Sequence, residues 1–278
     1  MRRSHIAAVL LIAGVPLAGC GSSSAPTATN AAGGITIPAE AGHVHGFAST
    51  RAGGIVIGTH GGLYALARGG ALEPVGEPAD YMGLAALPSG VLLSSGHPAP
   101  GSDEPNPLGL RRSSDGGASW TRIDAVPRDD YHVIESGGGR VYAVGSDGAV
   151  YAGAAPTTMA AVGMAPAGLI DLAVHPAQAG TLIAATQSGL SRSGDSGRTW
   201  TPVGDALGLL SWASPDALFM VDEQGQVSVS SDGAQSWSPR GTIGAPPAAL
   251  LASSPSDLVA ADHDGRIRSS ADGGRTWS

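Results

Sequence analysis

The chain has 278 residues, of which 42% are hydrophobic and only 14% charged, and its formal net charge is −8. It contains no lysine and no basic run beyond its first residues, which argues against a nucleic-acid partner. Glycine (43 residues) and proline (20) are frequent, but the charge is too low and the apolar content too high for a disordered chain. The glycines are therefore expected in the turns of a folded domain.

Residues 1–19 have the pattern of an export signal. Two arginines precede the apolar run IAAVLLIAGVPL, which is too short for a permanent membrane helix of ~20 residues. The following LAGC resembles the lipobox of bacterial lipoproteins. That resemblance implies cleavage before Cys20, lipidation of Cys20, export, and a membrane of the cell envelope as partner. Because Cys20 is the only cysteine, its lipidation leaves no thiol for disulfide or thiolate chemistry. Residues 20–34 are small and polar and predict a flexible tether.

Residues 35–278 contain six copies of one unit. Each copy has three short apolar runs broken by Gly, Asp, Ser and Pro, and four short strands in about 40 residues are typical of a propeller blade. We predict an all-β, sialidase-like β-propeller of six four-stranded blades, with strands a to d from the inside outwards. An insertion at 97–107 lengthens the second copy. The last copy lacks its outer strand, which residues 33–39 (GGITIPA) are expected to supply. The apolar residues that mark strand c are Leu63, Leu110, Val150, Leu190, Val227 and Ile267.

Four copies carry the pattern Ser-x-Asp-x-Gly-x-Ser/Thr-Trp in the predicted turn between strands c and d, with Ala234 replacing the glycine once. This pattern resembles the Asp-box, or BNR repeat, of sialidase-like propellers. An Asp in such a turn accepts hydrogen bonds from nearby backbone N–H groups, and the Trp adds apolar area to the blade. We therefore predict structural roles, with each Trp beginning strand d. The residues are Asp115, Trp120, Asp195, Trp200, Asp232, Trp237, Asp272 and Trp277.

The segments HVHG, GTHGGL and GHP, together with the Asp-boxes, also resemble exported bacterial propellers that are generally labelled glycosyl hydrolase or exo-sialidase. A sialidase needs converging arginines. Only Arg128 is expected on the face formed by the b–c turns and the d-to-a connections, so we expect no sialidase activity and assign no catalytic residue. Another glycoside hydrolase stays open, because two carboxylates can perform acid and base catalysis. The acids expected on this face are Asp80, Asp103, Glu104, Asp129, Asp130 and Asp171.

Histidines are the stronger functional signal. Five of them are expected where strand a begins or strand b ends in blades one to three, which places them on that same face: His43, His45, His60, His97 and His132. Neutral imidazole is the commonest protein metal ligand, so this pattern predicts one site for zinc or copper, with Met82 as a soft ligand for copper. Two alternatives are polar capping of strand ends and a catalytic His–Asp pair.

The predicted function is therefore that of an exported, lipid-anchored propeller, which we expect to be a monomer. It would bind a ligand, a metal ion, or a protein or glycan partner on its histidine-lined face. The alternative is a glycoside hydrolase-like enzyme.

Overall fold

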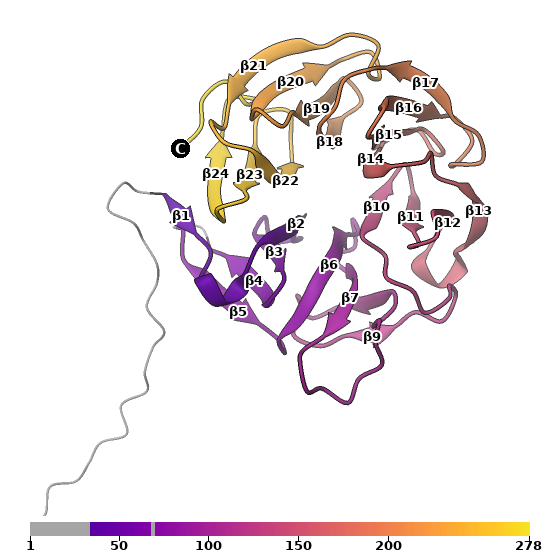
Figure 1. The fold of residues 1–278 in the computed structure, drawn as a ribbon, viewed down its shortest axis with the longest axis vertical. Helices are drawn as coiled ribbons and strands as arrows, with labels where there is room; N and C mark the ends of the chain where they lie inside the picture. Colours follow the sequence, from indigo (N-terminus) through magenta and orange to yellow (C-terminus); the bar gives the residue numbers. More distant parts are fainter. Residues whose placement is uncertain (1–33, 68–69) are drawn as a thin grey trace, which may run out of the picture.

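The computed structural model describes residues 34–67 and 70–278. Cys20, the predicted signal at 1–19 and all but the last residue of the predicted tether at 20–34 lie outside the described residues. The described residues form six four-stranded antiparallel sheets arranged in a ring (Figure 1). The only helices among them are two 3₁₀ turns, Ala39–Ala41 and Pro156–Thr158. The prediction of an all-β propeller with six blades is confirmed.

The blades follow one another along the chain, and each runs from its innermost to its outermost strand. Blade one comprises β2 (Val44–Ser49), β3 (Ile55–Thr59), β4 (Gly62–Leu66) and β5 (Leu72–Val75). Blade two comprises β6 (Ala79–Ala86), β7 (Leu92–Pro98), β8 (Arg111–Ser113) and β9 (Thr121–Arg122). Blade three comprises β10 (Val133–Gly137), β11 (Arg140–Val144), β12 (Ala149–Gly153) and β13 (Ala160–Met164).

The second half of the ring repeats this order. Blade four comprises β14 (Leu169–Val174), β15 (Leu182–Thr186), β16 (Gly189–Ser193) and β17 (Thr201–Gly204). Blade five comprises β18 (Leu209–Ser214), β19 (Ala217–Val221), β20 (Gln226–Ser230) and β21 (Ser238–Thr242). Blade six comprises β22 (Pro247–Ala252), β23 (Leu258–Asp262), β24 (Arg266–Ser270) and, as its outer strand, β1 (Ile35–Thr36).

The ring is closed by the N-terminal strand β1. It pairs antiparallel with β24, with Ile35 opposite Ile267 and Thr36 opposite Arg266 (Figure 1). The next residue continues the contact, because the Ile37 amide donates to the Gly265 carbonyl at 3.0 Å. The strand β1, which lies within the predicted segment, therefore supplies the missing strand of blade six, and the outer edge of β24 is covered along these pairs.

Apolar packing joins each blade to its neighbours. Leu93 and Leu110 of blade two share a buried cluster with Ile134 of blade three, and Ile57 of blade one shares another with Ile267 of blade six. Each side chain named here is at most 3% exposed. Since the inner strands are fixed by such contacts on both sides, the strand ends are held at defined places on the two faces of the ring.

The Asp-box turns follow strand c, as predicted, but in blades two, four and five the Trp lies just before strand d instead of beginning it. Trp200, for example, directly precedes β17. The turn requires a positive φ at the second residue after the Asp, which is 100° at Gly117 and 73° at Ala234. A Cβ on Gly117 would lie 2.3 Å from Leu63 Cδ2, so this turn docks against the preceding blade.

Antiparallel pairing places the a–b and c–d turns on one face of the ring, and the b–c turns and d-to-a connections on the other. The Asp-box turns thus lie on one face and the five predicted metal-binding histidines on the other, which we call the histidine face. None of the helices formed by residues 34–67 and 70–278 is long and apolar enough to cross a membrane.

Candidate metal centre

The five histidines come from three consecutive blades at the histidine face. His43 directly precedes β2 and His45 lies within it, while His60 directly follows β3. In blade two His97 lies near the end of β7, and in blade three His132 directly precedes β10. These positions agree with the predicted strand ends. The structure divides the five residues between two groups.

His43, His45 and His60 form the first group. Each offers a ring nitrogen, and the three nitrogens lie within 4.8 Å of one another. The rings of His43 and His45 are 4.4 Å apart between centroids, and those of His43 and His60 are 5.5 Å apart and nearly parallel. The backbone fixes this arrangement, because the His60 amide donates to the His43 carbonyl at 3.2 Å. Ligands of a tetrahedral zinc ion stand roughly 3.3 Å apart, so a small inward movement of these rings would complete three bonds.

The carboxylate of Asp80 adds a fourth group from the neighbouring blade. Its Oδ1 lies 3.2 Å from His45 Nε2 and its Oδ2 lies 2.9 Å from His60 Nδ1. The side chains of Asp80 and His45 are each only 11% exposed. Both His45 Nε2 and Asp80 Oδ1 are buried without a hydrogen-bond partner, so their 3.2 Å contact lacks hydrogen-bond geometry. Two buried polar atoms left unpaired in this way are costly, and a bound cation would satisfy both.

The protonation of His45 suits a metal ligand. Burial lowers its pKa to about 4, and nearby His43, His60 and His132 add to that effect, while Asp80 opposes it. His45 is therefore neutral at neutral pH, with a lone pair free for a metal ion.

Asp130 holds the second group. Its Oδ2 lies 2.6 Å from His132 Nε2 and 3.1 Å from His97 Nε2. The hydrogen bond to Asp130 raises the pKa of His132 above its ordinary value, against the effect of burial. On its other side, His97 Nδ1 lies 2.7 Å from Asn106 Oδ1. His97 and His132 therefore share Asp130, and neither belongs to the three-histidine group of blade one.

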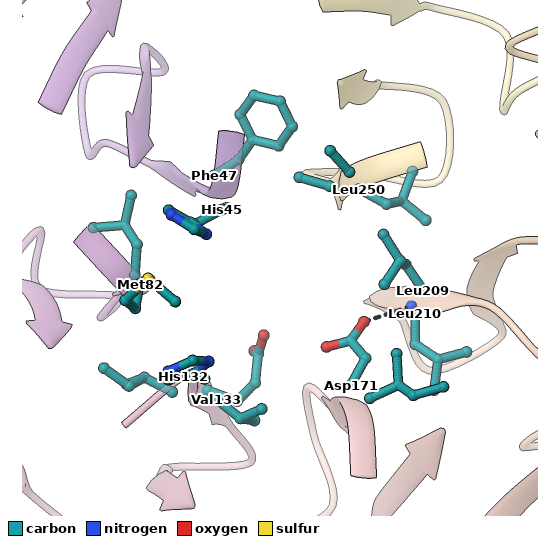
Figure 2. Close-up of a pocket in the computed structure, with 16 residues that line it drawn as sticks. His45, Phe47, Met82, His132, Val133, Asp171, Leu209, Leu210 and Leu250 are labelled. Atoms are coloured by element: carbon teal, nitrogen blue, oxygen red, sulfur yellow. Dashed lines mark hydrogen bonds between the residues drawn. The ribbon is translucent and has the colours of Figure 1, made fainter. Parts of the chain in front are cut away.

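The central channel opens beside both groups. Its mouth is a cavity of about 230 Å³ lined by His45, Met82 and His132 on one side and by leucines of blades five and six on the other (Figure 2). Met82, the predicted soft ligand, lines this cavity between His45 and His132 (Figure 2). A metal ion at His45 would therefore lie next to the channel mouth.

Two carboxyl groups line the channel further in. Burial and the charge of Asp171 raise the pKa of Glu135 to about 8, although its side chain keeps some exposure to the channel. Burial also raises the pKa of Asp171 to about 6, against hydrogen bonds from the Leu210 and Leu172 amides at 2.7 and 2.8 Å (Figure 2). Sequence reasoning missed Glu135. The available signal was an acid in the middle of a predicted innermost strand.

Asp129, Arg128 and the two tyrosines on this face have structural partners. Asp129 accepts from the amide and the hydroxyl of Ser146 at 3.0 and 2.7 Å. Arg128 donates to the Leu108 carbonyl at 3.3 Å. The tyrosines that follow Asp80 and Asp130 are buried, and their hydroxyls donate to backbone carbonyls four residues earlier. Asp103 and Glu104 lie exposed in the insertion of blade two.

No protein-family model matches the chain, and no curated protein matches its sequence. Solved structures do match its fold. The GH74 xyloglucanase from Xanthomonas campestris is 17% identical, with a TM-score of 0.60 over 86% of this chain and 38% of that one. A GH74 enzyme from Niastella koreensis is 14% identical, with a TM-score of 0.61 over 88% and 46%. The chain thus spans less than half the length of these two enzymes.

A protein described as YCF48 bound to D1 peptide is 19% identical, with a TM-score of 0.55 over 88% of this chain and 82% of that one. At such low identities these similarities establish the β-propeller fold alone. The fold is shared by enzymes and by a peptide-binding protein, so function has to be argued from the site.

Proposed function

We propose that this chain is an exported, lipid-anchored β-propeller that binds a divalent transition-metal ion, zinc or copper, on its histidine face. The ligands are His43, His45 and His60, with Asp80 as the fourth ligand or as the group that orients the rings. The observation that carries the proposal is the convergence of three ring nitrogens within 4.8 Å of one another beside the buried Asp80 carboxylate.

The ligand set suits these metals. Imidazole nitrogen with carboxylate oxygen is a common donor set for zinc, and imidazole also binds copper well. The ligands come from the ends of strands in two adjacent blades, so packing between the blades supports the site before metal enters. Preorganisation of this kind reduces the free-energy cost of binding.

The contacts favour binding over glycoside hydrolysis. Asp80 and Asp130 each contact two histidines, Asp129 is bound by Ser146, and the two adjacent tyrosine hydroxyls donate to the backbone. On a panel of chromogenic glycosides, including sialosides, we expect no turnover. Turnover that disappears in Asp171→Ala would overturn this assignment in favour of a hydrolase.

Export and anchoring enter the proposal through the LAGC segment. Changing Cys20 to Ser is expected to release the protein from the membrane fraction or to block its processing. A Cys20→Ser protein that fractionates with membranes as wild type does would contradict the anchor.

The metal site is tested by titrating the purified chain with Zn²⁺ in competition with a chromophoric chelator. Wild type is compared with a His43→Ala, His45→Ala double variant. Loss of two of three imidazole ligands should weaken binding at this site at least ~100-fold. The matched control is His263→Ala, which removes an exposed histidine at the end of strand b in blade six. Equal affinity of the wild type and the double variant would overturn the proposal, provided that circular dichroism shows both to be folded.

A further inference from the structure

We infer that the histidine face holds a second metal ion, bound by His97, His132 and Asp130. This inference deepens the proposed function because it concerns the same face, but it uses a separate set of ligands. The sequence pattern predicts one site containing all five histidines, whereas the structure separates them around two carboxylates.

The two carboxylates occupy equivalent places in consecutive repeats. Asp80 and Tyr81 are the second and third residues of strand a in blade two, and Asp130 and Tyr131 lie just before His132 and strand a of blade three. In both, the tyrosine is at most 1% exposed and its hydroxyl donates to the carbonyl four residues earlier. This shared anchor positions each acid beside two histidines. The residue after the tyrosine is Met82 in blade two and His132 in blade three. Blade three therefore offers a histidine ligand at the position where blade two has a methionine.

The hydrogen-bonding pattern around His97 favours a cation between His97 and Asp130. The Oδ1 of Asn106 is an acceptor, so the 2.7 Å contact requires a proton on His97 Nδ1. In neutral His97 the Nε2 lone pair then faces Asp130 Oδ2 at 3.1 Å, and two acceptors stand against each other. Asp130 Oδ1 is also buried without a hydrogen-bond partner. A metal ion between these atoms would convert both acceptors into ligands.

Asn106 then acts as the outer partner that orients a metal-binding imidazole. Metal-ligating histidines usually donate their second N–H to a carboxylate, a carbonyl or water, and this contact fixes the tautomer. Asn106 belongs to the insertion at residues 97–107, which distinguishes blade two from the other repeats. The inference therefore gives this insertion a role, namely to hold His97 with Nε2 turned towards Asp130.

The proposed second metal position, between His97, His132 and Asp130, is open to solvent. A groove of about 640 Å³ begins at Asp130 and His132 and continues along Val144, Met164 and Leu169. Three protein ligands with one open side are typical of zinc sites that exchange a water or a ligand, in contrast to closed structural sites. A ligand entering along this groove could reach the second metal directly.

The two positions are neighbours. Asp80 of the first group stands directly opposite His97 of the second in the β6–β7 register, and His45 and His132 border the same cavity. Two bound cations repel each other, so the ion that binds second is expected to bind more weakly than it would to the empty protein.

The test is the number of Zn²⁺ ions bound by the full chain, measured by equilibrium dialysis with elemental analysis. Wild type and His263→Ala should bind two ions. The His43→Ala, His45→Ala variant and the His97→Ala, His132→Ala variant should each keep one, and the variant with all four changes should bind none. If the His97→Ala, His132→Ala variant does not fold, Asp130→Asn gives the same test with a side chain of equal size, and should weaken the second ion at least ~10-fold.

The outcomes separate this inference from the proposed function. One ion in wild type, with affinity unchanged in the His97→Ala, His132→Ala variant, would overturn the second site and leave the first intact. Loss of both ions in either double variant would also overturn it, because all five histidines would then form one shared cluster. Two ions retained without His43 and His45 would instead overturn the proposed function.

Discussion

The two faces of the ring use aspartate in opposite ways. In the Asp-box of blade five, Asp232 Oδ1 accepts from Ser230 Oγ and from the Gln235 and Ser236 amides, and Oδ2 accepts from Ser236 Oγ. On the histidine face, Asp80 and Asp130 each keep one buried oxygen, Oδ1, without a hydrogen-bond partner, and each carboxylate lies beside two imidazoles. A carboxylate bonded fully by its own turn supports a fold. A carboxylate that keeps an unpaired oxygen among histidines remains available to bind a cation.

Electrostatics separate the Asp-box acids from an acid of the central channel. Hydrogen bonds from Ser236 and Ser230 lower the pKa of Asp232 to about 2, which keeps this group ionised and bound to its turn at all ordinary pH values. In the channel, burial raises the pKa of Glu135 to about 8. The structural acids are thus stabilised as anions, while the channel acid retains its proton near neutral pH.

The largest expected effect lies on the Asp-box side of the comparison. Trp237 packs against the buried cluster that joins blades four and five. Trp237→Ala should lower the free energy of unfolding by about 3 kcal/mol, through lost burial and the cavity left behind. Urea denaturation measures this loss. Zn²⁺ affinity should stay unchanged, and a parallel fall in affinity would show that the two faces are not independent.

Asp80→Asn should have the converse effect. The amide keeps the size of the side chain but removes the negative charge, so Zn²⁺ affinity at the first position should fall about 10- to 100-fold. Stability should change little, because one carboxylate oxygen is unpaired in wild type. Competition titration and thermal unfolding, run on the same sample, measure both. A strongly destabilised protein with wild-type affinity would place Asp80 among the structural acids.

Glu135→Gln tests the protonated acid of the channel. A folded-state pKa of about 8, above the ordinary pKa of Glu, means that the folded state holds an extra proton between about pH 4.5 and pH 8. Wild-type stability should therefore decrease as pH rises through this window. The variant should lose that part of the slope and should therefore gain stability relative to wild type as the pH rises from 5 to 8. Equal slopes in urea unfolding would show that Glu135 ionises normally.

The smallest effect is expected for Asp232→Asn, the matched partner of Asp80→Asn. The lowered folded-state pKa of Asp232 gives stability that is present above about pH 4 and is lost as pH falls towards 2. The variant should melt at a lower temperature than wild type at pH 7, and the difference should shrink by pH 2.5. Unchanged Zn²⁺ binding is the control, and a difference that grows in acid would contradict the assignment.

The fold was predictable because its signals are local and repeated. Six repeated apolar residues at or directly before strand c indicated the blade number, and the missing outer strand of the last repeat pointed to β1. The convergence of histidines followed from strand ends alone. Their division between Asp80 and Asp130 was not predictable, because it depends on side-chain directions and on the register that sets Asp80 opposite His97. Glu135 was missed because a single acid in an inner strand carries no repeated pattern.

Closure through β1 has a consequence for the order of folding during synthesis. Of the strands, β1 is synthesised first, yet its hydrogen-bonding partner β24 is synthesised only after the other five blades. Blades can form one after another as their strands leave the ribosome. Ile35, however, cannot pair with Ile267 until nearly the whole domain has been synthesised. Contacts between residues so far apart in the sequence form slowly. Ring closure is therefore a late step in folding, and until it happens blade six keeps an unpaired edge open to other chains.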